Sequence, residues 1–136
     1  MTPEQITIVE TTIAGLDLAE LTADFYRRAF AGDPALADMF TTDPAVQQSR
    51  FAQELEVIVT SIRGFDDFAT RTRALGARHY GYGVRAPHFR LMRAALLDAL
   101  EAAIGDGWND EVAGAWRLAY NLTAEMMMAG ATDRQA

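Results

Sequence analysis

The stretch Leu75-Gly-Ala-Arg-His79-Tyr-Gly-Tyr-Gly-Val84-Arg-Ala-Pro87-His-Phe89 places a histidine on the apolar face of a predicted helix, just before a glycine-rich corner. Leu75 lies one helical turn before His79, and Val84 follows the break, so apolar side chains would flank the imidazole on both sides. A buried imidazole in such surroundings is a suitable ligand for an iron ion. The alternative is a half-buried core histidine whose ring bonds to a backbone carbonyl.

Helix-start signals recur along the chain, and most of them join a capping side chain to a proline in the first turn. They occur at Thr2-Pro3, Asp17, Asp33-Pro34, Asp43-Pro44, Asp66/Asp67, Pro87 and Asp110. In the longer predicted helices, apolar residues recur at helical spacing, and no segment alternates apolar and polar residues as a strand does. The sequence therefore predicts an all-α fold, with one domain over residues 1–136 and a frayed tail over 129–136.

Composition excludes several classes of function. Half of the 136 residues are apolar, which is enough for one compact core. The absence of cysteine excludes thiol nucleophiles, zinc–thiolate sites and iron–sulfur clusters. A formal net charge of −7 argues against a nucleic-acid partner. The first residues show neither a basic region nor a long apolar run, so we expect no membrane anchor and a cytoplasmic protein.

Two other patterns around the corner do not indicate a site. Residues 81–86 fit the glycine pattern of dinucleotide-binding loops, but they follow a predicted helix instead of a strand. His79 and His88 are nine positions apart across a break, which is not the spacing of a two-histidine metal site. We expect His88 to be an exposed residue of the next helix's first turn.

Two further motifs accompany the His79 stretch. Upstream, Phe25-Tyr26 leads through Asp33-Pro34 to Met39-Phe40, and downstream the last predicted helix carries Ala115-Trp116-Arg-Leu-Ala119-Tyr120. In order and spacing these motifs resemble the bacterial single-domain globins and the globin domain of flavohaemoglobins, from about Thr2 to about Met128. The resemblance implies the globin fold, an all-α three-over-three helical sandwich around a haem pocket.

The same resemblance assigns roles to individual residues. His79 would be the iron ligand of a haem b, and the missing Cys-x-x-Cys-His motif makes that haem non-covalent. Tyr26 and Gln47 would be the distal residues that meet a bound gas. Their alternatives are a core tyrosine bonded to a carbonyl and a glutamine that points to water. Further cofactor contacts would come from Phe40, Phe51, Leu75 and Val84.

These roles imply reversible binding of dioxygen and other diatomic gases, such as nitric oxide or carbon monoxide. Flavohaemoglobins polarise the proximal histidine with a tyrosine and a glutamate, and the matching positions here are Phe89 and Ala131. Oxidative chemistry is therefore less favoured. Two alternatives stay open: a nitric oxide dioxygenase served by a separate reductase, since no flavin or nicotinamide domain is expected, and a globin-fold sensor or interaction module. The sequence does not determine the oligomeric state.

Overall fold

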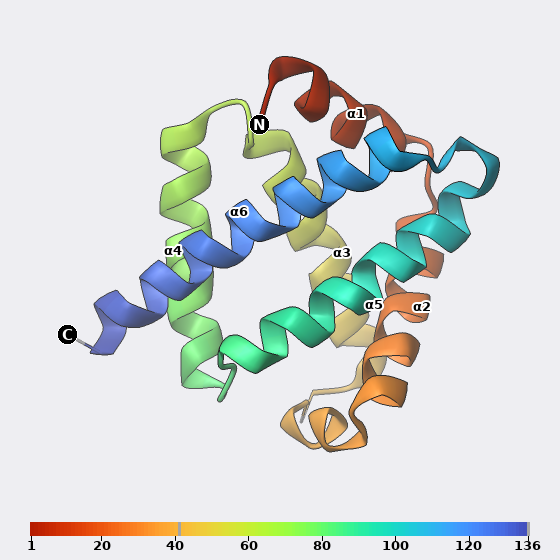
Figure 1. Cartoon of the computed structure of the whole chain (residues 1–136). Coiled ribbons are helices and arrows are strands. Elements are labelled where there is room, and N and C mark those ends of the chain that lie inside the picture. The colour runs from red at the N-terminus through yellow and green to blue at the C-terminus, as the bar shows by residue number, and fades with distance from the viewer. Residues whose placement is uncertain (41, 136) are drawn as a thin grey trace.

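The computed structural model describes residues 1–40 and 42–135, and nearly all of them lie in helices (Figure 1). The α-helices are α1 (Pro3–Ala14), α2 (Leu18–Gly32), α3 (Pro44–Ser61), α4 (Phe65–Gly81), α5 (Ala86–Ile104) and α6 (Asp110–Gln135). Two short 3₁₀ helices, η1 (Pro34–Met39) and η2 (Gly105–Gly107), lie in the connections. The described residues contain no strand, so the all-α prediction is confirmed.

Local capping chemistry starts most of these helices where the sequence predicts. Thr2 and Gln5 bond reciprocally at the start of α1, with 3.1 Å between Gln5 N and Thr2 Oγ1. Aspartates accept backbone N–H groups at the starts of α2, η1 and α3. The expected cap at Asp66 or Asp67 is wrong. Gly64 holds the cap position of α4, and both carboxylates lie in the first turn, where they still favour the positive end of the helix dipole.

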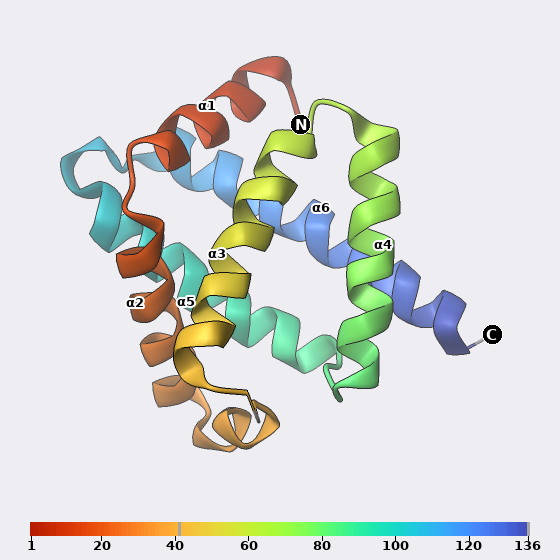
Figure 2. The same cartoon turned by 180° about the vertical axis from the view of Figure 1, so that it is seen from behind.

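The helices form two crossing layers. Helices α5 and α6 cross in front of α3 in Figure 1, and Figure 2 shows α3 on the opposite face between α2 and α4. Helix α2 packs against α5, and α4 packs extensively against α6. The core between the layers includes the fully buried side chains of Val9, Leu21, Leu36, Phe68 and Leu100.

Two aromatic side chains of α6 form hydrogen bonds to other helices, one to α1 and one to α5. Trp116 Nε1 donates to Thr12 Oγ1 of α1 at 2.9 Å, and the Tyr120 hydroxyl donates to the Phe89 carbonyl of α5 at 2.5 Å. Both partners are at least partly buried, so each bond satisfies a group that water reaches poorly.

Helix α6 continues to Gln135, although the sequence predicts a frayed tail from Ala129. Gly130 is buried against α4, and this packing extends the helix beyond what local sequence would support. The last position of the expected tail, residue 136, lies outside the described residues.

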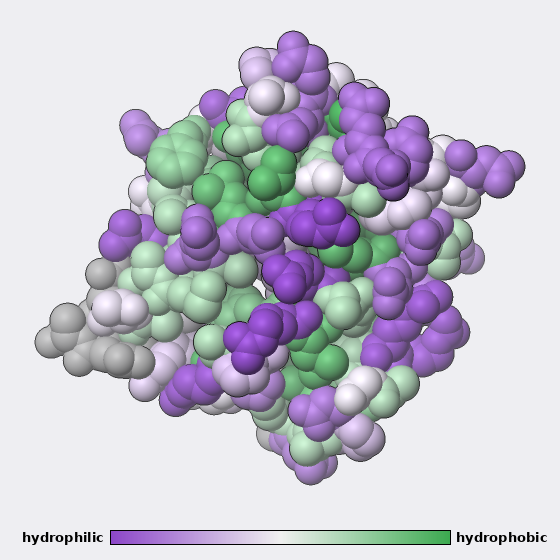
Figure 3. Space-filling model, in the orientation of Figure 1, coloured by the Kyte–Doolittle hydropathy of each residue, from purple (hydrophilic) through white to green (hydrophobic). Residues whose placement is uncertain are grey.

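The surface mixes polar and apolar side chains. Hydrophilic residues form a band across the face shown in Figure 3, with apolar residues above and below it. The most exposed large apolar side chains, Phe65, Tyr82, Leu118 and Val46, come from different parts of the chain, which is usual for a folded domain. No described helix has the length and apolar character needed to cross a lipid bilayer.

Candidate functional site

His79 lies in the last turn of α4, and its ring is held by the backbone of its own helix. Nδ1 lies 2.8 Å from the Leu75 carbonyl oxygen. Because a carbonyl only accepts, Nδ1 carries the proton, and Nε2 keeps its lone pair. Among the described residues, Nε2 has no hydrogen-bond partner. The ring is thus oriented and left with one open nitrogen, as a metal-binding histidine requires.

Burial keeps this imidazole neutral. Desolvation holds the pKa of His79 below its usual value of 6.5, although the bond to the Leu75 carbonyl and the charge of Glu54 act in the opposite direction. A neutral imidazole is the form that binds metal. Glu54 lies on α3, two turns after Gln47. Glu54 is not among the predicted site residues, although its spacing from Gln47 puts it on the same helix face.

The corner after α4 fixes the backbone around His79. The His79 carbonyl accepts from Val84 N at 3.1 Å and from Tyr82 N at 3.0 Å, and Gly83 adopts a left-handed φ of 98°. That conformation favours glycine, because a side chain there would clash with the backbone. Val84 bonds to the His79 carbonyl through its backbone N–H, and the Leu75 carbonyl accepts from the His79 ring, so the structure links these three predicted residues.

Arg85 closes the same corner, and sequence analysis gave it no role. Its guanidinium lies 3.7 Å over the Tyr80 ring and donates to the carbonyls of Tyr80 and Val84 at 3.0 and 2.9 Å. It therefore caps the C-terminal end of α4. His88 accepts from Arg85 N at 2.8 Å and is partly buried, so the expectation of an exposed His88 is wrong.

On the other side of the site, Tyr26 of α2 meets Gln47 from the first turn of α3. Gln47 Nε2 donates to the Tyr26 hydroxyl oxygen at 3.3 Å. Tyr26 is only 5% exposed, and burial raises its pKa above the usual 10.0, so the hydroxyl stays protonated. Since its oxygen accepts from Gln47, the O–H of Tyr26 is left to donate elsewhere. Among the described residues, the Tyr26 hydroxyl bonds to no carbonyl, and the Gln47 amide points to Tyr26.

Aromatic rings surround this polar pair. Phe40 and Phe51 both meet the Tyr26 ring edge-on, each with 5.6 Å between ring centroids. Phe51 also stacks on Phe25 at 4.5 Å. A cavity of about 180 Å³ opens beside the pair. Its lining consists of Tyr26, Phe30, Ala37, Phe40, Thr42, Pro44, Gln47 and Gln48.

The structure thus gathers the predicted residues in two groups. One group, Tyr26, Phe40, Gln47 and Phe51, comes from α2, η1's C-terminal cap and α3. The other, which contains His79, comes from α4 and its corner, and α3 packs against α4 (Figure 2). Of the predicted residues, Tyr26, Phe40 and Gln47 line the cavity, whereas Phe51, Leu75, His79 and Val84 do not.

No polarising partner for His79 stands at the two positions that matter in flavohaemoglobins. Phe89 offers only its backbone carbonyl, which the Tyr120 hydroxyl occupies, and position 131 is an alanine. The bond partner of His79 Nδ1 is a neutral carbonyl, not a carboxylate. The imidazole therefore donates less electron density than one paired with a carboxylate.

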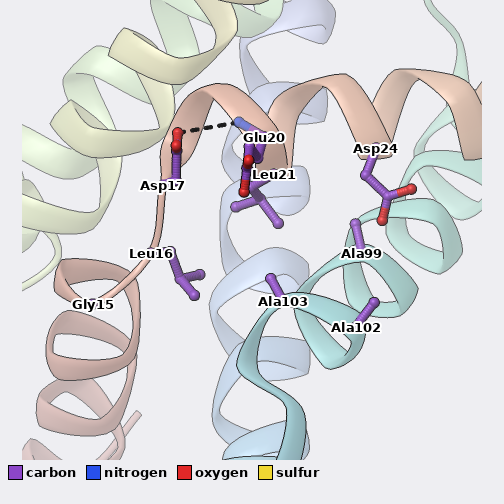
Figure 4. Close-up of a pocket in the computed structure, with 9 residues that line it drawn as sticks. All are labelled: Gly15, Leu16, Asp17, Glu20, Leu21, Asp24, Ala99, Ala102 and Ala103. Carbon is purple, nitrogen blue, oxygen red and sulfur yellow. Dashed lines mark hydrogen bonds between the residues drawn. The ribbon is translucent and has the colours of Figure 1, made fainter.

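A second hollow lies at the α1–α2 corner against α5 (Figure 4), and none of the predicted site residues lines it. Two of its three acidic residues have structural partners: Asp17 accepts from the backbone N–H groups of Ala19 and Glu20, and Asp24 pairs with Arg27 and Arg28. These bonds explain the carboxylates of Asp17 and Asp24 without a ligand.

Comparison with known proteins places the chain in a family. Residues 23–127 match the family model for globins, and this range includes Tyr26, Gln47 and His79. A leghemoglobin from Canavalia lineata is 32% identical over 110 residues, which cover 73% of each chain. A flavohemoprotein from Deinococcus radiodurans is 28% identical over 137 residues, covering 94% of this chain but only 33% of the relative.

The fold agrees with solved structures. A bacterial globin from Campylobacter jejuni superposes with a TM-score of 0.85 at 22% identity, and the alignment covers 97% of both chains. The chain spans about a third of the flavohemoprotein it matches and nearly the whole of this globin structure. From its helical architecture and the family match over most of its length, the chain belongs to the globin family.

Proposed function

We propose that this globin binds haem b through His79 and holds dioxygen and other diatomic gases reversibly, with Tyr26 and Gln47 as the distal residues. The observation that carries the proposal is the state of His79, whose Nδ1 is bonded to the Leu75 carbonyl while Nε2 is open. A histidine that is oriented, neutral and unpaired at one nitrogen is suited to bind a metal.

The residues present fit a haem. Leu75, Val84, Phe40 and Phe51 supply apolar surface for a porphyrin, and the chain has no cysteine for covalent attachment. When bound, the haem would supply an iron with one coordination position open to gas. The relative from Canavalia lineata is itself named a leghemoglobin, which supports the proposed haem function.

Tyr26 and Gln47 account for gas retention. The Tyr26 O–H would stabilise a bound gas that carries partial negative charge, because it is a hydrogen-bond donor. The Tyr26 hydroxyl is buried and protonated, and the Gln47 amide holds its oxygen so that the hydrogen is directed elsewhere. The donor is thus oriented before the ligand arrives.

The proximal side favours binding over oxidation. His79 bonds to a neutral carbonyl, while Phe89 and Ala131 replace the residues that polarise this histidine in flavohaemoglobins. Nitric oxide oxidation would also need a source of electrons, and the described residues form a globin fold without providing one.

The test is a spectrum of the purified protein after haem supplementation. We expect a Soret band, and acid–organic extraction should remove the haem. His79→Ala should abolish haem retention, whereas the matched variant His88→Ala should keep it, because His88 is engaged by Arg85 at the corner. A colourless wild type would refute the proposal, and equal losses in both variants would show that His79 is not the ligand.

A further inference from the structure

Helices α4 and α6 cross with their backbones in contact, and two glycines make this possible. A Cβ atom built on Gly76 of α4 would lie 1.9 Å from the Met127 carbonyl oxygen of α6. A Cβ atom on Gly130 of α6 would lie 1.9 Å from the Arg73 carbonyl oxygen of α4. Any side chain at either position would have to push the two helices apart.

The contact is reciprocal. Gly76 lies three residues after Arg73, and Gly130 lies three residues after Met127, so each glycine faces the carbonyl one turn before the other glycine. Gly76, Met127 and Gly130 are all buried. Backbone atoms cannot rotate out of the way as side chains do, so this crossing fixes the distance between α4 and α6 closely.

The crossing lies one turn from the imidazole. His79 follows Gly76 by three residues, and its ring bonds to the carbonyl of Leu75, the residue next to Gly76. A lateral shift of α4 at Gly76 also moves the residues one turn away, because the backbone bonds of the helix are continuous. The position of His79 is therefore tied to the contact with α6.

We propose that Gly76 and Gly130 are positioning residues for His79, which set how far its open Nε2 projects toward the haem. The inference rests on the proposed haem function. To restore an ordinary contact of 3.4 Å or more from 1.9 Å, an alanine at either position must part the helices by about 1.5 Å. Such a shift displaces the iron ligand without touching any residue that contacts the gas.

The experiment compares Gly76→Ala and Gly130→Ala with Gly114→Ala, a control on α6 where an added Cβ meets nothing within 4 Å. The readouts are the iron–histidine stretching frequency in the ferrous haem-loaded protein and the rate of haem transfer to an acceptor. We expect both crossing variants to shift the frequency and to lose haem about ten- to a hundredfold faster, while the control matches wild type.

A second set of variants, made in a protein that lacks the His79 side chain, distinguishes a positioning role of Gly76 from general damage to the haem site. In His79→Gly loaded with haem and free imidazole, the iron ligand is no longer tethered to α4. Adding Gly76→Ala there should leave the iron–imidazole frequency unchanged. A shift that persists in this background would overturn the inference, as would wild-type frequencies in folded crossing variants.

Failure of the proposed haem function can be distinguished from failure of this inference, because in the first case the wild-type protein itself takes up no haem. If both crossing variants fail to fold while Gly114→Ala folds, the glycines serve folding rather than ligand placement, and the inference is overturned.

Discussion

Replacing Tyr26 with phenylalanine removes one hydroxyl from the distal side and changes almost no volume. The Tyr26 ring is only 5% exposed and packs edge-on against Phe40 and Phe51, and phenylalanine keeps these contacts. The fold and haem uptake should therefore persist. Only the gas-bound state should lose an interaction, so the effect should appear in the rate at which dioxygen dissociates.

The size of the effect follows from the donor. A hydrogen bond to a charged acceptor contributes about 1.5–3 kcal/mol, which corresponds to a roughly ten- to 150-fold faster dissociation of dioxygen. The structure narrows this range. Without the Tyr26 oxygen, the Gln47 amide loses its partner at 3.3 Å and is able to turn toward the ligand. The Gln47 amide would then replace part of the lost hydrogen bond, so we expect the acceleration of dioxygen release to lie near the lower end of this range.

Ligand replacement in a stopped-flow instrument and laser photolysis measure the rates. Carbon monoxide is a poorer acceptor than dioxygen, so its dissociation should change far less, and this contrast separates a lost donor from general damage to the pocket. Gln47→Leu should accelerate dioxygen release less than Tyr26→Phe does. In the double variant the loss should exceed the sum of the two single effects, because neither donor is left to compensate. An unchanged dioxygen release in Tyr26→Phe would return this residue to a packing role.

Three further predictions concern turnover, stability and pH. Mixed with nitric oxide, the dioxygen-loaded 136-residue chain should consume at most one nitric oxide per haem and then stall, because conversion to nitrate oxidises the iron by one electron; sustained turnover with a nicotinamide cofactor alone would contradict this. Trp116→Phe should lower the free energy of unfolding of the haem-free protein by about 1–3 kcal/mol in urea titrations, because it removes the part-buried bond of 2.9 Å between the indole N–H and Thr12. Thr12→Val should show a similar loss. Strictly additive losses in the double variant would refute the coupling between the two residues. Because burial lowers the pKa of His79, the unfolded chain binds more protons than the folded chain below pH 6.5. As the pH decreases from 6.5 toward the lower pKa of the folded state, the stability of the haem-free protein should therefore fall, and it should fall less in His79→Leu. Parallel curves of stability against pH for the two proteins would contradict this.

The helices could be predicted because their signals are local. Asp17, Asp33 and Asp43 cap helices through bonds to backbone groups two or three residues away, and a sequence contains all of that chemistry. The start of α4 and the end of α6 could not be predicted in the same way. Gly64 has no capping side chain, and residues 129–135 are helical where α6 packs on α4, a helix distant in sequence.

The contacts of the candidate site also include local ones and ones between residues distant in sequence. The bond between His79 and the Leu75 carbonyl lies within one helical turn, and a ring bonded to a backbone carbonyl is the alternative that the sequence leaves open for His79. The meeting of Tyr26 with Gln47 came from the family resemblance, since 21 residues separate them. Arg85 and Glu54 were missed because their roles depend on the shape of the α4–α5 corner and on how α3 lies against α4, which no local pattern encodes.

The glycine crossing also bears on the order in which the protein is made. Gly76 and Gly130 are far apart in sequence, so the contact between them closes a long loop and forms only after most of the chain exists. During synthesis, α2 and α3 leave the ribosome well before α6, so Tyr26 and Gln47 are made long before Gly130. The residues proposed to face the gas thus precede the contact that is proposed to place His79. If the proposed haem function holds, a nascent chain stalled within α6 should hold haem loosely, and firm capture of the cofactor should require the complete α6.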